Sequence, residues 1–205
     1  MDRFVPAEHT SVPDRIEAGT WAAAAVVTQG EVTIENARPE HMELFLTKLS
    51  DAGAEVSVTD AGLRIRQPAR PRAVDFVTLP HPGIATDFHP ILLAMLATAD
   101  GTAIVTENVF EDRFLYVGEL QRMGADIRTE GHHAVIRGVP RLSAAPVRAL
   151  DIRAGAAMVV AALGADGVTE VSDAGHLDRG YEDFEAKLES LGAEVRRERE
   201  LIGLP

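Results

Sequence analysis

Three aspartates stand where apolar helices are expected to begin. Asp14, Asp87 and Asp151 each precede a run rich in alanine or leucine. An aspartate at such a position usually caps the helix by accepting hydrogen bonds from its first N–H groups. Asp14 has Glu17 at capping-box spacing, so a cap is favoured there. Asp87 follows a stiff loop ending in Thr86, which could itself be the cap, so a cap and a general base are equally favoured for Asp87.

Arginines lie near the same helix starts in the sequence. Arg153 falls in the first turn of the third apolar helix, where a cation opposes the helix dipole. An anionic ligand would resolve that conflict. Arg113 and Arg179 precede the outer helices, and each adjoins an acidic residue. A surface ion pair with that neighbour is the ordinary explanation for both, and it is the one favoured for Arg113.

The histidines do not predict a metal site. His81 and His89 flank the loop before Asp87, but no further histidine or carboxylate has the spacing of a ligand set. His176 and Asp178 are most simply a structural hydrogen-bonded pair. The sequence contains no glycine-rich nucleotide motif, nucleophile elbow or zincin motif. We therefore expect neither a metal nor a cofactor.

An internal repeat indicates which elements position these residues. Three similar helical segments end at glycines spaced about 70 residues apart, which is the signature of a repeated structural unit: Gly53, Gly124 and Gly192. A second set of glycines, each between an apolar and a β-rich segment, has nearly the same period: Gly30, Gly101 and Gly167. The units are predicted to have the order β-α-β-α-β-β and to cover about residues 10–68, 74–140 and 146–200.

The first helix of each unit is apolar on nearly every face, so it should be buried. These helices are predicted at 15–28, 88–99 and 152–164, each followed by a strand, at 31–35, 102–106 and 168–172. The pattern predicts one α/β domain of pseudo-threefold symmetry over residues 1–205, with the last unit fading after Arg197. Equivalent helices should begin at one end of the domain, where their N–H groups and dipoles would attract an anion.

Composition limits the function classes. The net charge of −12 argues against general binding to nucleic acid or anionic membranes. The absence of cysteine excludes disulfides and a cysteine nucleophile within this sequence. No signal-peptide pattern is present, and the longest apolar stretches are far shorter than the ~20 residues of a membrane span. A cytoplasmic location is expected.

Several of these motifs together resemble the UDP-N-acetylglucosamine 1-carboxyvinyltransferase family of enolpyruvyl transferases. The resemblance runs from about residue 6 to 197 and rests on the segments Val12–Thr20, Thr86–Asp87, Thr106–Phe114, Asp151–Ala154 and His176–Glu182. It implies an inside-out α/β fold, in which two similar domains of three units enclose the active site. This sequence is similar to the C-terminal domain only.

The resemblance also implies a reaction. The family transfers enolpyruvyl from phosphoenolpyruvate to the 3′-hydroxyl of UDP-N-acetylglucosamine and releases phosphate, in peptidoglycan precursor synthesis. By position, Asp87 would contact that hydroxyl as general base, and the Val109 backbone would help to hold the UDP-sugar. Arg179 would bind phosphoenolpyruvate, while Asp151 and Arg153 would support proton transfer and charge at the reacting centre.

The family's other domain supplies the proton-donating cysteine or aspartate and further anion ligands. Because none of these is found in this sequence, the chain is expected to be inactive alone and to need a complementary N-terminal domain or a homo-oligomer. Two alternatives remain open: a non-catalytic module that binds a UDP-sugar or a partner protein, and an enolpyruvyl transferase for another sugar nucleotide.

Overall fold

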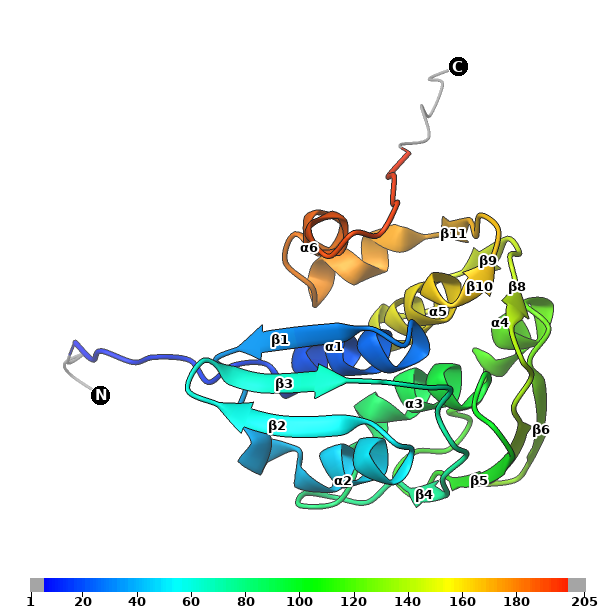
Figure 1. The fold of residues 1–205 in the computed structure, drawn as a ribbon, viewed down its shortest axis with the longest axis horizontal. Coiled ribbons are helices and arrows are strands. Elements are labelled where there is room, and N and C mark those ends of the chain that lie inside the picture. The colour runs from blue at the N-terminus through cyan, green and yellow to red at the C-terminus, as the bar shows by residue number, and fades with distance from the viewer. Residues whose placement is uncertain (1–5, 199–205) are drawn as a thin grey trace, which may run out of the picture.

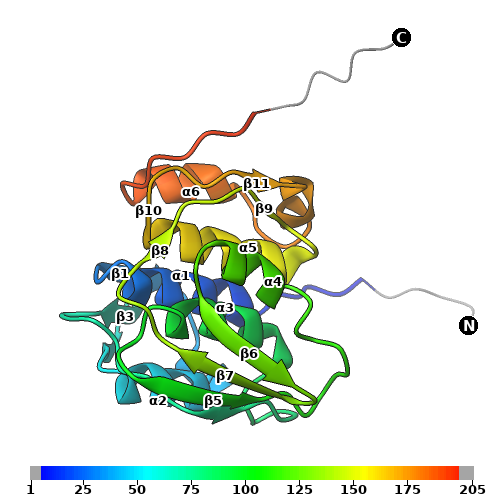
Figure 2. The same cartoon turned by 90° about the vertical axis from the view of Figure 1, so that its right-hand side faces the viewer.

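Three buried helices form the centre of the protein. The computed structural model describes residues 6–198, and within it α1 (Arg15–Val27), α3 (His89–Leu96) and α5 (Ile152–Leu163) pack against one another (Figures 1 and 2). Every residue of α3 is buried. The sequence supplies this because the helices are apolar all round and rich in alanine, which lets them approach closely.

The first unit covers α1 with a three-stranded antiparallel sheet. β1 (Glu31–Glu35), β2 (Glu55–Thr59) and β3 (Gly62–Arg66) have the order β1-β3-β2. Leu63 and Ile65 of the middle strand are fully buried. The 3-10 turn η1 (Pro39–His41) and the amphipathic α2 (Glu43–Asp51) connect the strands. The described residues before α1 form no strand, so the expected first strand of this unit is absent.

The second unit repeats that arrangement. β5 (Thr102–Thr106), β6 (Asp126–Glu130) and β7 (His133–Arg137) have the order β5-β7-β6, and the short β4 (Phe76–Val77) pairs parallel to β5. The register of β5 on β7 is the same as that of β1 on β3, with five facing pairs in each. The 3-10 turn η2 (Thr86–Phe88) leads into α3, and α4 (Val117–Arg122) is the outer helix.

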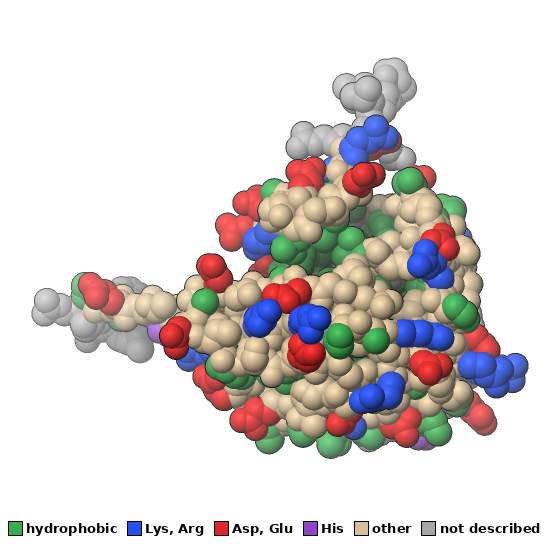
Figure 3. Space-filling view, viewed as in Figure 1, with side chains coloured by type: hydrophobic (Ala, Val, Ile, Leu, Met, Phe, Trp, Pro, Cys, Tyr) green, Lys and Arg blue, Asp and Glu red, His purple; other side chains and the backbone are tan. Residues whose placement is uncertain are grey.

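The third unit differs from the expectation. Its strands are only two residues long and form two separate parallel pairs. β8 (Leu142–Ser143) pairs with β10 (Ala165–Asp166), and β9 (Val147–Arg148) pairs with β11 (Val171–Ser172). The strand expected over 168–172 is therefore formed only at its end, and residues 193–198 form no strand. η3 (Ala174–Arg179) and α6 (Phe184–Ser190) complete the unit. Hydrophobic side chains gather in a hollow between α6 and β1 (Figure 3).

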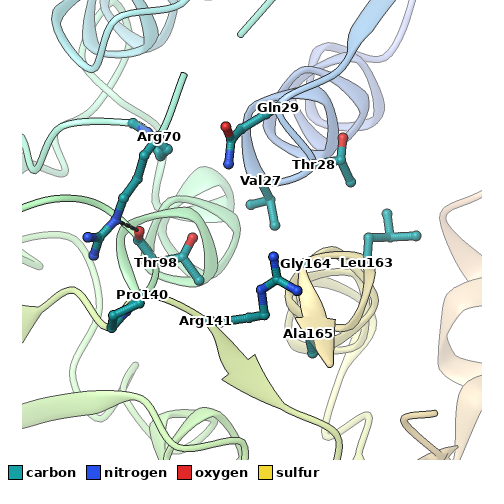
Figure 4. A pocket seen from close by; sticks show the side chains of 11 residues that line it. Val27, Thr28, Gln29, Arg70, Thr98, Pro140, Arg141, Leu163, Gly164 and Ala165 are labelled. Carbon is teal, nitrogen blue, oxygen red and sulfur yellow. Dashed lines mark hydrogen bonds between the residues drawn. The ribbon is translucent and has the colours of Figure 1, made fainter. Parts of the chain in front are cut away.

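The central helices run in one direction. Their C-terminal ends surround a cavity of about 260 Å³, lined by residues that include Val27, Thr98 and Leu163 (Figure 4). Arg70 donates hydrogen bonds to the carbonyl oxygens of Thr98 and Ala99 at this end. The three N-termini therefore share the opposite end of the domain. Within residues 6–198, no helix is both long and apolar enough to cross a membrane.

Candidate functional site

Asp87 lies at the shared N-terminal end of the central helices, within η2. Its Oδ1 accepts a hydrogen bond from Arg113 Nη2 at 3.1 Å, and its Oδ2 accepts one from Arg153 Nε at 3.2 Å. The Asp87 side chain is 37% exposed, so a ligand can reach it. Neither η2 nor α3 has a side-chain cap. Asp87 is thus not a cap, and the suggested cap at Thr86 is wrong because its hydroxyl donates elsewhere.

The surface ion pair favoured for Arg113 is also wrong. The partner of Arg113 is Asp87, 26 residues earlier in the sequence, rather than a neighbouring acid. The guanidinium carbon of Arg113 lies 5.8 Å from the centre of the Phe110 ring, which favours this placement of the cation. Arg113 therefore belongs to the site, and only the fold shows it.

Asp151 caps α5 and places Arg153. Asp151 Oδ1 accepts hydrogen bonds from the N–H groups of Arg153 at 2.7 Å and Ala154 at 2.8 Å. The Arg153 side chain is 20% exposed, and its Nη1 is buried without a hydrogen-bond partner among the described residues. Asp14 caps α1 in the same way, through the N–H of Ile16, as its sequence predicts.

A buried tyrosine adjoins Arg153. The Tyr181 hydroxyl lies 2.8 Å from Thr20 Oγ1, which joins the third unit to α1. Burial raises the pKa of Tyr181, although the hydrogen bond with Thr20 and the positive charge of Arg153 act in the opposite direction. Tyr181 therefore stays neutral near pH 7 and can donate or accept a hydrogen bond beside the arginine.

Arg179 ends η3 and is exposed. No ion pair or hydrogen bond of its side chain occurs among the described residues, because the adjacent Asp178 pairs with Arg197 instead. The pairing considered for His176 and Asp178 is likewise not formed. Asp87, Arg113 and Arg153 together are called the Asp87 cluster below. Gly180 lies against Arg153, since a Cβ added to Gly180 would be 3.6 Å from Arg153 Nη1. Arg179 is therefore the sequence neighbour of a residue that contacts this cluster.

Glu107 is a buried part of the site that sequence reasoning missed. It directly follows β5 and is 1% exposed. Its carboxylate accepts hydrogen bonds from Thr86 Oγ1 and from the backbone N–H groups of Val109 and Phe110. Burial alone would raise the pKa of Glu107, but these hydrogen bonds lower it overall. The available signal was an acidic residue directly after a strand with an apolar centre.

His89 is a buried core residue rather than a ligand. Its Nδ1 lies 2.7 Å from the Tyr116 hydroxyl, and the rings of Phe76 and Phe114 pack at its edges. Burial lowers the pKa of His89 to about 4, so it is neutral at pH 7. No cluster of metal-ligating side chains occurs in the part of the chain that the structure describes.

The site joins a carboxylate to two guanidinium groups at converging helix N-termini. Guanidinium groups bind carboxylates and phosphates with two parallel hydrogen bonds, and helix N-termini also attract anions. A carboxylate among them can accept a proton from a hydroxyl group. The arrangement therefore suits a reaction between an anionic molecule and an alcohol.

Comparisons with known proteins agree with this chemistry. The sequence is 54% identical over 197 residues to UDP-N-acetylglucosamine 1-carboxyvinyltransferase of Mycobacterium bovis, and 53% identical to that of Nocardia farcinica. These matches cover 96% of this chain but only 47% and 46% of the two relatives. The chain thus spans about half the length of the curated relatives it matches.

Solved structures show the same fold. The enolpyruvyl transferase NikO from Streptomyces tendae superimposes with a TM-score of 0.74 at 28% identity, over 90% of this chain and 44% of that one. An EPSP synthase from Acinetobacter baumannii superimposes with a TM-score of 0.72 at 19% identity, over 89% and 46% of the two chains. The enolpyruvyl transferase-like α/β fold expected from the sequence is confirmed.

A family assignment follows from the sequence match. The family model for EPSP synthase (3-phosphoshikimate 1-carboxyvinyltransferase) matches residues 3–188, which is most of the chain. The match covers the first two repeated units and most of the third, and it includes Asp87, Arg113 and Arg153. This chain belongs to the EPSP synthase family of carboxyvinyltransferases.

Proposed function

We propose that this chain is the C-terminal half of a UDP-N-acetylglucosamine 1-carboxyvinyltransferase. The reaction transfers enolpyruvyl from phosphoenolpyruvate to the 3′-hydroxyl of UDP-N-acetylglucosamine and releases phosphate. The single observation that carries the proposal is the Asp87 cluster, in which one carboxylate lies between Arg113 and Arg153 at the helix N-termini. About half of the residues are identical to those of enzymes with that name.

Each residue then has a role that its surroundings support. Asp87 accepts the proton of the sugar hydroxyl as general base. Arg153 offers a buried, unpartnered N–H group, and Asp151 holds the backbone of that arginine. Arg179 is free of protein partners among residues 6–198 and binds phosphoenolpyruvate, while the backbone of Val109 holds the UDP-sugar.

The proton for the methylene carbon of phosphoenolpyruvate must come from another group. Among the described residues, the side chains that bond to Asp87 are the cations Arg113 and Arg153, which cannot supply a proton at neutral pH. We therefore propose that a complementary N-terminal domain completes the site, or that a second copy of this chain does so. A single copy of the chain binds substrate without turnover, and the reaction takes place in the cytoplasm.

The acceptor we favour is UDP-N-acetylglucosamine rather than another sugar nucleotide. Identity to the curated UDP-N-acetylglucosamine enzymes is 53–54%, whereas identity to the enolpyruvyl transferase from Streptomyces tendae is 28%. A non-catalytic module is disfavoured because an ordered pair of arginines on an exposed aspartate has no structural need. Such a pair contributes little to stability where water reaches it.

Phosphate release tests the proposal. The purified chain is mixed with phosphoenolpyruvate and UDP-N-acetylglucosamine, alone and with a separately produced N-terminal domain of the Mycobacterium bovis relative. We expect no release alone, release on mixing, and loss of release with Asp87→Asn. Asp126→Asn is the matched control, since Asp126 pairs with Arg137 on a remote strand. Turnover by the chain alone would show that a second copy of this chain, rather than an N-terminal domain, completes the site. An active Asp87→Asn mixture would contradict the role of Asp87 as general base.

A further inference from the structure

The Glu107 carboxylate joins two loops that meet at the site. It is 1% exposed and has no ion pair with a lysine or arginine among the described residues. An isolated buried charge of this kind is strongly unfavourable unless hydrogen bonds replace its lost water. Its presence in a well-packed core therefore calls for a specific set of donors.

Those donors come from both loops. Oε2 accepts from Thr86 Oγ1 at 2.8 Å, while Oε1 accepts from the N–H groups of Val109 at 2.7 Å and Phe110 at 3.0 Å. The fully buried Thr78 also holds the second loop, because its Oγ1 accepts a hydrogen bond from the N–H of Asn108 at 3.0 Å. The two oxygens of Glu107 thus point to different segments, and neither is free to turn to solvent.

The segments joined in this way carry the reacting groups. Thr86 immediately precedes Asp87, and its hydroxyl is the anchor of that turn to Glu107. The second segment holds Val109 and continues to Arg113, which returns to Asp87 at 3.1 Å. The two segments are therefore connected at two points, by the hydrogen bond between Thr86 and Glu107 and by the ion pair between Asp87 and Arg113. These two connections form a closed ring of contacts that includes the Val109 amide.

We infer that Glu107 is a positioning residue, which sets the distance and orientation between the Asp87 base and the loop that holds the acceptor sugar. This inference rests on the proposed function, since it assigns the two ends of the ring to one substrate. Glu107 itself touches no substrate. A hydroxyl group that is displaced by about 1 Å from its base can react ~100-fold more slowly, so such a residue has a large effect at a distance.

A carboxylate suits this role better than its nearest substitutes. Glutamine offers one acceptor oxygen, which must stay on the two backbone N–H groups because these can only donate. Its NH₂ then faces the Thr86 hydroxyl, which has to turn from donor to acceptor. Hydrogen bonds to a charged acceptor are also stronger than those to a neutral amide. Aspartate is one methylene shorter and does not reach both loops. Glu107→Gln should therefore loosen one half of the ring while preserving side-chain volume.

The first test uses the ligand-free chain. Nuclear magnetic resonance follows the amide protons of Val109 and Phe110 and the carboxyl carbon of Asp87 in wild type and Glu107→Gln. We expect both amides to exchange about tenfold faster in the variant, because a charge-assisted hydrogen bond is lost, and the Asp87 signal to move. Thr86→Val should move the Asp87 signal as well, and Thr86→Ser should restore it, since serine keeps the hydroxyl.

The control is Thr47→Val. The Thr47 hydroxyl donates to the Glu43 carbonyl on the exposed face of α2 and touches neither loop. It should leave all three signals unchanged. Unchanged Val109, Phe110 and Asp87 signals in Glu107→Gln would overturn the inference, as would a Thr86→Ser variant that behaves like Thr86→Val. If Glu107→Gln fails to fold, the comparison of Thr86→Val with Thr86→Ser tests the inference in its place.

The second test titrates the same proteins with UDP-N-acetylglucosamine. We expect the dissociation constant to rise about tenfold in Glu107→Gln and Thr86→Val, in proportion to the lost hydrogen bond, and to stay unchanged in Thr86→Ser and Thr47→Val. Equal affinity in all variants would overturn the inference. Absence of binding to wild type would refute the proposed function, and the ligand-free signals would still decide the role of Glu107.

Discussion

Acid should destabilise this protein through one buried histidine. His89 is the first residue of α3 and is 0% exposed, with its Nδ1 2.7 Å from the Tyr116 hydroxyl. Burial lowers the pKa of His89 to about 4, from an ordinary value of 6.5; nearby Glu107 acts to raise it, and Arg113 acts to lower it. The folded protein therefore resists protonation that the unfolded chain accepts readily.

The sign and size follow from that difference. The stabilising contribution of neutral His89 is complete above pH 6.5 and is lost as the pH falls from 6.5 toward 4, because the unfolded state then binds more protons. Between pH 7.5 and 5.5 the free energy of unfolding should fall by about 1.3 kcal/mol from this residue alone, at 1.36 kcal/mol per pH unit. The full loss below pH 4 amounts to about 3 kcal/mol.

Urea unfolding at pH 7.5, 6.5 and 5.5 measures this effect. The range stays above the unfolded pKa of glutamate, so Glu107, whose pKa is lowered, contributes no change within it. His89→Gln provides the comparison, since glutamine keeps a polar side chain but does not titrate. We expect the variant to be less stable at pH 7.5 and to lose most of the wild-type dependence on pH. An unchanged dependence in His89→Gln would refute the reasoning.

Two further predictions concern folding. Gly19→Ala should destabilise the protein by about 1–3 kcal/mol through overpacking, because the new Cβ would lie 2.4 Å from the Phe88 ring. A Cβ at Gly118 would have nothing within 4 Å, so Gly118→Ala should stabilise α4 by ~0.5 kcal/mol. Urea unfolding measures both variants, and equal effects would exclude a steric cause. Asp151→Ala should cost about 1 kcal/mol by removing the α5 cap, while Asp151→Asn should retain most of that stability in the same assay, and an equal loss in both variants would show that capping is not the cause.

The central helices and the sheets of the first two units were predictable from the sequence. The apolar runs and repeated glycines placed α1, α3 and α5 within a few residues of their observed bounds. β1 and β5 have the predicted bounds, because each lies between a turn glycine and an exposed loop and pairs with a hairpin of the same unit. Local pattern and tertiary partner agree at these places.

The third unit was not predictable in the same way. Residues 168–172 have the same β-rich composition as β1 and β5, yet only Val171 and Ser172 pair. A strand forms when its backbone groups find partners, and the composition of a segment does not say whether they exist. In the first two units the partner is the middle strand of a hairpin. Within residues 6–198 the third unit offers no such strand, so residues 168–170 have no strand to pair with.

The site was predictable in its residues but not in its contacts. Asp87 and Arg153 could be singled out from their places at helix starts, whereas nothing local could choose between a cap and a base. The choice depends on two arginines that are 26 and 66 residues away. The same reason explains the error on Arg113, whose ion-pair partner is Asp87 rather than an acidic neighbour in the sequence.

The repeat explains how so acidic a protein, with a net charge of −12, would bind anions at one place, as the proposed function requires. Each unit begins its buried helix at the same end, so one helix N-terminus per unit is added there whatever the charge elsewhere. Arg113 comes from the second unit and Arg153 from the third, and Asp87 holds both in place until a ligand arrives. A bound anion would replace Asp87 as the partner of one guanidinium group, so that group would stay paired. Under the proposed function, the binding of the anionic substrate would offset the free-energy cost of freeing Asp87 as a base. Proton removal from the sugar would then depend on the presence of that substrate.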